Sequence, residues 1–443
     1  MTEVAIDPRT NKQARRAWYF YDFGNSAYAA VILLAVFSNY FTNGVVGDKV
    51  LGPTYWNYSL AIAGIIVAVL SPILGTIADF SRAKKKFLLI FTVMSVVFTM
   101  LLFFVQKGDV LMAVIFFILA EIGYRAAQVF YDALLVDVST PRTIASVSAD
   151  LWALGMLGGI ICLGIVLVPI QLTHNNVLAV RLSFVITGLF YALSSIPTFL
   201  RVRQISEPEV LPGGVTTLGY TFKQLGDTFR DIRSFSEFVK YTIAFLIYND
   251  GIMMLMDNAA LIGGILYGFQ TTQLIILIII LHVFGAAGAY LFGRVSSKYS
   301  SKQALIYALI ILMAVVSLLF FLRGVPAFYV IGALAGFALS GVQAVSRTMV
   351  SQLSPANKTT EFYGFLSVAG RTSTFIGPLV FGSLYSSMAT RYLRMGKVDA
   401  VAHASAMYWA IGSILVFLLV GLFLLLFVRQ APVHDPLKID HVD

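Results

Sequence analysis

Four polar side chains recur at helical spacing in and just before the otherwise apolar stretch YRAAQVFYDALLVD (124–137). Glu121, Arg125, Gln128 and Asp132 are four, three and four residues apart, which places them on one face of a helix. A charge in the middle of a membrane span costs at least about 2.5–3.5 kcal/mol, so this face should point into a helix bundle or a water-filled path. Arginine suits carboxylate binding, and a poorly hydrated carboxylate exchanges protons near neutral pH. We predict that Arg125 and Gln128 bind substrate and that Glu121 or Asp132 carries a proton. The structural alternative is a ladder of ion pairs.

A second polar group lies in the stretch that begins YNDG, where Asp250 and Asp257 are seven residues apart and therefore on one face, with Asn249 and Asn258 beside them. Both aspartates are candidates for proton coupling. Asp250 is expected to be deep, either functional or paired with Arg371 or Arg125. Asp257 is expected nearer the outer mouth, where solvent would make it ordinary. Arg371 should be buried, and it either binds substrate or forms a structural pair. The remaining predicted substrate-lining residues are Asn25, Tyr28 and Gln343.

The composition determines which kind of element positions these residues. Of 443 residues, 58% are hydrophobic and only 12% are charged, and the mean hydropathy is +0.84; soluble domains carry about 25% charge. The chain is therefore a polytopic membrane protein, and its spans should be helices because lipid offers no partner for an unpaired backbone. Runs of about 20 apolar residues predict twelve spans: 17–43, 54–80, 85–106, 109–137, 143–171, 177–201, 236–267, 271–295, 302–323, 325–352, 359–389 and 403–429.

The net charge of +9 is distributed unevenly between the predicted connections. Basic clusters at 9–16, 82–86, 201–240 and 294–302 fall on one side of the membrane, and the opposite side is poor in them except at 391–397. By the positive-inside rule the basic side is cytoplasmic, so both termini are predicted to be cytoplasmic. Basicity here indicates topology rather than nucleic-acid binding.

The longest connection divides the predicted spans into two sets of six. We expect an N-terminal six-helix half at 1–201, a cytoplasmic linker with an amphipathic helix at 202–235, a C-terminal half at 236–429 and a cytoplasmic tail at 430–443. The two halves resemble each other weakly. The clearest pair is YDFG at Tyr21 and YNDG at Tyr248, an offset of 227 residues. Paired six-helix repeats are typical of transporters.

Beyond these patterns, the chain resembles the major facilitator superfamily. Gly75, Asp79 and the lysines at 84–86 match its basic turn between spans two and three, whereas Phe80 and Arg82 depart from it. The resemblance implies a major facilitator fold in which the fourth helix of each half lines the central cavity. It also implies that Arg125 and Gln128 match an arginine–glutamine motif linked to proton coupling, although Val129 replaces the usual glycine.

Five ordered strings resemble, within that superfamily, the vacuolar amino-acid effluxer family first recognised in autophagy and its bacterial relatives. Asp132 departs from the usual asparagine of this family, and an arginine at position 125 is uncommon in it, so the chemistry of these charges is particular to this branch. The strings are WYFYDFGNSAY (18–28), FYDALLVDVS (130–139), YNDGI (248–252), GVQAVSRTMVSQLSP (341–355) and EFYGFLSVAGRTSTFIGP (361–378).

Charged residues at the predicted cytoplasmic ends of the spans could close the two halves against each other. Ion pairs there would be broken when the cavity turns inward. The alternative is that these charges only set topology. The predicted gate residues are Asp79, Asp137, Arg142, Arg347 and Glu361.

Enzyme chemistry has no support in the sequence. No metalloprotease, nucleophile-elbow or Walker A motif occurs, and the five histidines and one cysteine form no ligand cluster, so we expect no catalytic residue, no metal and no cofactor. The prediction is a secondary active transporter that imports a small polar metabolite, an amino acid or related carboxylate-bearing solute, with protons by alternating access. The alternative is an exporter of drugs, siderophores or other amphiphiles. The expected partners are a small-molecule substrate, protons and the lipid bilayer, with the protein a monomer in a bacterial inner membrane.

Overall fold

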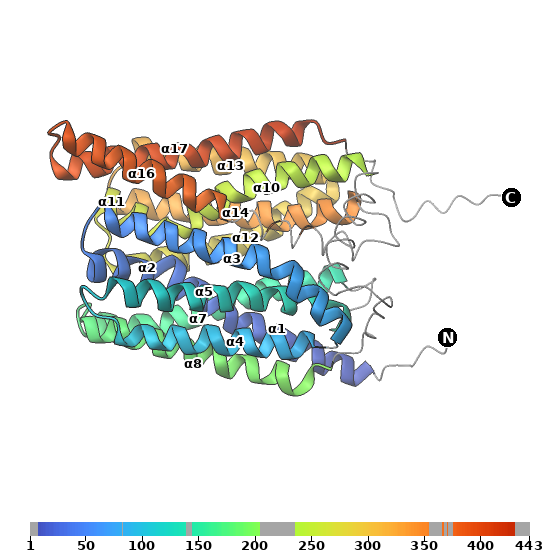
Figure 1. Ribbon diagram of the computed structural model, residues 1–443. Coiled ribbons are helices and arrows are strands. Elements are labelled where there is room, and N and C mark those ends of the chain that lie inside the picture. The colour runs from blue at the N-terminus through green and yellow to red at the C-terminus, as the bar shows by residue number, and fades with distance from the viewer. Residues whose placement is uncertain are drawn as a thin grey trace, which may run out of the picture.

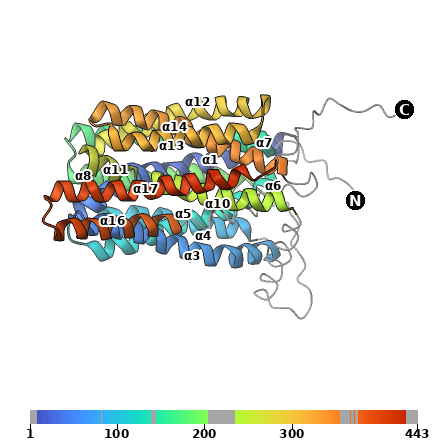
Figure 2. The same ribbon diagram turned by 90° about the horizontal axis from the view of Figure 1, so that it is seen from above.

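The computed structural model describes residues 8–81, 83–138, 144–203, 235–353, 366, 370 and 375–429. Long helices run side by side along one direction and form a single bundle (Figure 1, Figure 2). We call residues 8–203 the first half and residues 235–429 the second half. The inner end of the bundle is where α1 begins and α17 ends, and the outer end is opposite.

The first half contains five long, regular helices and one irregular one. Their bounds and those of the short elements between them are α1 (Pro8–Tyr28), η1 (Ala29–Ala35), α2 (Phe37–Asn39), η2 (Tyr40–Val46), α3 (Leu51–Ser81), α4 (Lys84–Leu101), η3 (Leu102–Phe104), α5 (Val110–Ala133), α6 (Leu135–Val138), α7 (Ile144–Leu172) and α8 (Val177–Arg201).

The second half follows the same plan. Its described elements are α10 (Ser236–Asp257), α11 (Ala259–Tyr267), α12 (Thr271–Lys298), α13 (Ser301–Phe321), α14 (Val325–Leu353), α16 (Ile376–Arg394) and α17 (Asp399–Leu426). In Figure 1 these helices occupy the upper part of the bundle, and those of the first half lie below them.

Eleven helices within the described ranges are long and apolar enough to cross a membrane. Each corresponds to one of the predicted spans. The remaining predicted span, 359–389, begins outside the described residues, and α16 covers its later part. The all-helical membrane architecture is confirmed, while the total of twelve spans and the cytoplasmic termini stay predictions.

Both halves contain an irregular first helix, which the hydropathy pattern did not predict. In the first half the α-helix changes at Ala29 to the π-helical segment η1. In the second half the predicted single span 236–267 is broken at Asn258, whose side-chain amide donates to the carbonyl of Met254 at 2.9 Å. Asparagine competes in this way with the regular helix ladder. Subtracting the offset of the YDFG–YNDG pair, 227, from 258 gives position 31, which lies within η1.

Small residues let the helices of each half approach closely. A Cβ atom at Gly24 of α1 would lie 2.6 Å from Ser194 of α8, and one at Gly251 of α10 would lie 3.1 Å from Phe417 of α17. The glycines of YDFG and YNDG thus serve the same contact, between the first and last helix of a half. Between the halves, α3 packs on α16 and α7 on α12.

Candidate functional site

A buried arginine in the first half contacts carboxylates from both halves. Arg125 Nε donates to Glu121 Oε1 one helical turn away on α5. Its Nη2 lies 3.9 Å from Asp257 Oδ2 at the end of α10. The Glu121 side chain is fully buried, and those of Arg125 and Asp257 are 13% and 5% exposed. Glu121 and Arg125 therefore lie together on a buried face of α5, as their spacing predicts.

Two tyrosines complete the wall around Glu121. Tyr28, the last residue of α1, donates its hydroxyl to Glu121 Oε2 at 2.9 Å. Its ring stacks on Tyr124 with 4.5 Å between centroids. Both Glu121 oxygens thus accept a hydrogen bond, one from the charged Arg125 and one from the neutral hydroxyl of Tyr28. These two bonds hold the carboxylate beside the irregular segment η1.

Asp257 lies deeper than the sequence suggested. It is 4% exposed, so the expectation of an ordinary solvated residue at the outer mouth is wrong. The chain bends at Asn258 and carries on as α11 toward the outer end, which covers Asp257. Its backbone carbonyl accepts the indole N–H of Trp56 at 2.9 Å, and the amide of Asn57 donates to Asn258 Oδ1 at 2.8 Å. The helix break is therefore fixed by α3 of the first half.

Buried acceptor oxygens without a hydrogen-bond donor lie at this break and on α1. Among the described residues, Asn25 Oδ1, Asn57 Oδ1 and Asp257 Oδ2 accept no hydrogen bond. Most buried polar atoms are hydrogen-bonded, and an unsatisfied one requires an explanation such as a ligand. Interrupted helices at mid-membrane are where secondary transporters build substrate sites. Asn57 Oδ1 and Asp257 Oδ2 lie at the break, where they could accept from a cationic donor, whereas Asn25 lies beside Asp22 on α1.

The other predicted substrate-lining residues divide between α5, α10 and α14. The amide of Gln343 on α14 donates to Asn249 Oδ1 on α10 at 3.3 Å, so this predicted pair is brought together. Asp250, next to Asn249, is 3% exposed, as expected for a deep residue. Gln128 is partly buried on α5, one turn past Arg125. Arg371 lies outside the described residues.

Asp132 belongs to a separate electrostatic group nearer the inner end. It interacts with Asp22 of α1, and Asp22 interacts in turn with Arg347 of α14. Asp22 lies against α7, since a Cβ at Gly155 would come within 2.2 Å of its carboxylate. Arg347 was predicted as a gate residue, and the structure brings it near a carboxylate of the first half.

The other predicted gate residues are only partly described. Asp137 lies on α6. Asp79 lies in α3, within the part of that helix whose side chains are not described. Arg142 and Glu361 fall outside the described residues. The cytoplasmic gate therefore stays a prediction.

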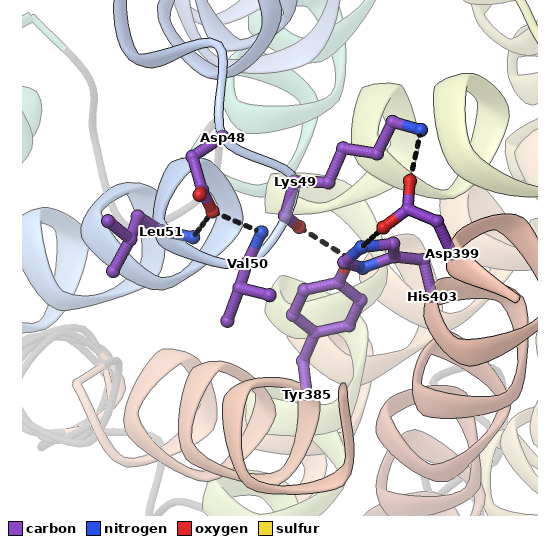
Figure 3. A network of polar contacts seen from close by, with 7 residues as sticks. All are labelled: Asp48, Lys49, Val50, Leu51, Tyr385, Asp399 and His403. Carbon is purple, nitrogen blue, oxygen red and sulfur yellow. Dashed lines mark hydrogen bonds and ion pairs between the residues drawn. The ribbon is translucent and has the colours of Figure 1, made fainter. Parts of the chain in front are cut away.

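Contacts between the halves close the outer end of the bundle. Asn39 donates to Thr271 at 3.0 Å, and Thr272 donates to Asn175 at 3.0 Å. Lys49 pairs with Asp399 at 2.7 Å, and the Tyr385 hydroxyl donates to the Lys49 carbonyl at 2.7 Å (Figure 3). These contacts join the two halves at the outer end.

The sequence reasoning missed several of these residues. Trp56 and Asn57 act through contacts between distant segments, which leave no local pattern. Asn258 was noted beside Asp257, but the helix break at this residue was not predicted. His403 had one available signal, because it lies four residues after Asp399 and so on the same helix face. Within the described ranges no cluster of histidine, cysteine and acidic residues could hold a metal ion.

Comparison with known proteins places this architecture in a family. The model of the family described as "Vacuole effluxer Atg22 like" matches residues 44–141 and 136–430. The "Uncharacterized MFS-type transporter YxiO" of Bacillus subtilis (strain 168) is 29% identical over 440 residues, covering 96% of this chain and 97% of that protein. "Autophagy-related protein 22" of Coccidioides immitis is 22% identical over 417 residues, covering 77% and 69%.

Solved structures show the same fold at low identity. A bacterial homologue of the human lysosomal transporter Spinster, in an inward-facing and unoccupied conformation, aligns with a TM-score of 0.68 at 14% identity, covering 96% of this chain and 100% of that one. The nucleoside transporter NupG aligns with a TM-score of 0.66 at 12% identity, covering 94% and 99%. The chain is a multi-pass membrane transporter with the major facilitator fold, and it belongs to the vacuole effluxer Atg22-like family.

Proposed function

We propose that this protein is a secondary active transporter that imports an amino acid, or a related carboxylate-bearing solute, together with protons by alternating access. The observation that carries the proposal is Arg125, which lies buried between Glu121 of the first half and Asp257 of the second half. A guanidinium at the boundary of two moving halves senses both its ligand and the relative position of the halves. We place the protein, as a monomer, in a bacterial inner membrane.

The substrate carboxylate would bind the Arg125 fork. The 3.9 Å separation from Asp257 is an ion pair without hydrogen-bond contact, so it is the weaker of the two carboxylate contacts described for Arg125. A bidentate carboxylate–guanidinium pair is stronger and directional. Substrate binding would replace the long contact with a short one.

The substrate ammonium group would bind the opposite side of the cluster. Asp257 Oδ2 and Asn57 Oδ1 are buried acceptors without a hydrogen-bond donor in the described part of the chain. An ammonium group is a compact donor of three hydrogen bonds, like the head of a lysine. A zwitterion would therefore satisfy Arg125 and these oxygens together, which favours an amino acid over a simple anion.

Glu121 is the residue we assign to the coupling proton. It binds Arg125 directly, so its charge competes with that of the substrate carboxylate. A proton on Glu121 would remove this competition while the Tyr28 contact held the side chain in place. Proton and substrate would then bind cooperatively, which is the requirement for symport. Asp132 and Asp250 stay candidates for proton coupling, but the ion pairs described for Arg125 are with Glu121 and Asp257.

Alternating access would use the interrupted helices. η1 and the α10–α11 break flank the cluster and face each other across the two halves, since η1 packs against both α10 and α11. Discontinuous helices bend where their hydrogen-bond ladders are already broken. Binding at Arg125 and Asp257 would thereby be transmitted to the outer contacts.

The test is uptake of a mixed, isotope-labelled amino-acid pool into proteoliposomes with an alkaline interior. Native protein is expected to accumulate particular amino acids, and Arg125→Ala is expected to lose this activity. Arg323→Ala is the matched control, because Arg323 contacts carbonyls of the 319–322 turn and the side chains of Tyr267 and Tyr408, none of which belongs to the Arg125 cluster. A folded native protein that accumulates no amino acid would refute the proposal.

A further inference from the structure

Four residues at the outer end form a continuous polar network between the halves, which we call the outer latch: Lys49, Tyr385, Asp399 and His403 (Figure 3). His403 Nε2 lies 3.1 Å from Asp399 Oδ1, and His403 Nδ1 lies 3.0 Å from the Tyr385 hydroxyl. The hydroxyl is 2.7 Å from the carbonyl of Lys49, and the ammonium of Lys49 is 2.7 Å from Asp399 Oδ2. Lys49 belongs to the first half and the other three to the second.

Counting donors and acceptors shows which protonation state of His403 satisfies all three contacts at once. A backbone carbonyl only accepts, so the single hydroxyl proton of Tyr385 is committed to Lys49. The hydroxyl must then accept from His403 Nδ1. The Asp399 carboxylate, which pairs with Lys49, also only accepts, so His403 Nε2 must donate as well. Both ring nitrogens donate at once only in the imidazolium form.

We propose that His403 is a proton-binding site and that the outer latch closes fully only when this proton is bound. The proposal rests on the alternating-access function, for which it supplies a regulatory site distinct from Glu121. With neutral His403, one nitrogen has no hydrogen. Tyr385 must then turn its proton toward the ring and release the Lys49 carbonyl, or the ring must leave Asp399.

The charged groups around His403 support a cation at this place. Asp399 on α17 and Lys49 on the 47–50 loop form one ion pair, and Asp48 on the same loop interacts electrostatically with Tyr385 of α16. Asp48 accepts from the backbone N–H groups of Val50 and Leu51, both at 2.8 Å, so its charge holds the loop in shape.

Two carboxylates and one ammonium leave a net negative charge among these groups. A protonated His403 balances it.

Solvent exposure gives the proton a direction of entry. The His403 side chain is only 4% exposed, while those of Lys49 and Asp399 are 59% and 55% exposed. Asp399, the partner of the ring, is thus exposed to solvent at the outer end, whereas the ring itself is buried. Under this proposal, the protonation of His403 depends on the pH of the outer side and not on that around the Arg125 cluster.

The expected effect follows from linkage. If closing binds one proton and opening releases it, the ratio of closed to open outer ends changes up to tenfold per pH unit. This applies within the range of about pH 5 to 8 in which histidine changes its charge. Acid outside favours the closed outer end, and alkali favours the open one.

Spin-label distances measure this ratio without any substrate. Labels are placed at Leu51→Cys and Val398→Cys, two positions beside the outer latch that are 43% and 72% exposed, in a Cys162→Ala background that removes the native cysteine. In the reconstituted full-length protein the short distance should dominate at acid pH and give way to a longer one at alkaline pH. A distribution that does not change with pH would overturn the proposal.

Two variants test whether His403 and Tyr385 cause the pH dependence. His403→Gln should abolish the pH dependence, because glutamine does not titrate. Tyr385→Phe removes the hydroxyl that requires the second proton, so the pH dependence should fall well below tenfold per unit while the ring contact with His403 is kept. An unchanged pH dependence in either variant would contradict the assignment.

Nitrogen NMR on histidine-labelled protein reads the protonation directly. The His403 signal is identified among the five histidines by its loss in His403→Gln. Both ring nitrogens should carry protons under the conditions in which the labels report a closed outer end. A singly protonated ring in that state would refute the donor count. Because neither measurement needs a solute, failure of amino-acid uptake with a titrating latch would reject the substrate and leave the latch standing.

Discussion

Replacing Glu121 by glutamine should separate substrate binding from proton coupling. Glutamine is nearly isosteric and resembles the protonated acid, so the side chain can keep its contact with Tyr28 while losing the charge that holds Arg125. The variant should bind substrate tightly at every pH, whereas the native protein should bind it more tightly as the pH falls. The physical reason is that deprotonated Glu121 competes with the substrate carboxylate for one guanidinium.

The magnitude follows from the hydrogen bond that changes. Glutamine still accepts a hydrogen bond from the charged guanidinium, so what is lost is the attraction between two opposite charges. We expect this loss to weaken the hold on Arg125 by about 1–2 kcal/mol, on the scale of one charge-assisted hydrogen bond, which corresponds to about a 5- to 30-fold gain in substrate affinity at alkaline pH. Asp257 still faces Arg125 at 3.9 Å, so the arginine is not left as an uncompensated buried charge.

The assay compares two modes of transport in the same proteoliposomes. Glu121→Gln should keep exchange of labelled for unlabelled substrate and lose accumulation driven by a pH gradient. Asp132→Asn is the matched control, since it neutralises a carboxylate further along α5 that belongs to the group of Asp22. Gradient-driven accumulation by Glu121→Gln at the native level would show that the coupling proton resides elsewhere and that our reasoning is wrong.

Three further predictions concern stability and local opening of the helix break. Arg125→Ala should lower the free energy of unfolding by about 3–5 kcal/mol, because it leaves Glu121 buried without its cation; thermal denaturation in detergent measures this, and a loss below about 1 kcal/mol would contradict the packing. Gly158→Ala should destabilise the protein by about 1–3 kcal/mol, because its Cβ would lie 2.0 Å from the Phe23 carbonyl and must push α1 away from α7; Gly164→Ala, which meets nothing within 4 Å, is the control. Trp56→Phe removes the donor to the Asp257 carbonyl and should cost about 1–3 kcal/mol; amide hydrogen exchange should then rise at 257–262, and unchanged exchange there would show that the break does not depend on this bond.

The sequence by itself determined the membrane class and the inward-facing polar stripe. Twelve per cent charge and recurrent apolar runs leave helices in lipid as the solution, because an unpaired backbone is too costly there. The spacing of Glu121 and Arg125 was sufficient to put them on one helix face, since that relation depends only on helix geometry. The short strings shared with the effluxer family identified the fold that the comparisons then confirmed.

The tertiary structure alone decided which charges meet. Asp257 was expected in solvent, but the break at Asn258, held by Trp56 and Asn57, buries it against Arg125. Asp132, equally well spaced on α5, joins Asp22 instead. The outer latch unites residues more than three hundred positions apart, and the proposed proton site at His403 rests on the three partners that the fold places around it. Periodicity fixes the face of a helix, whereas the partner across that face depends on how two halves of the chain pack.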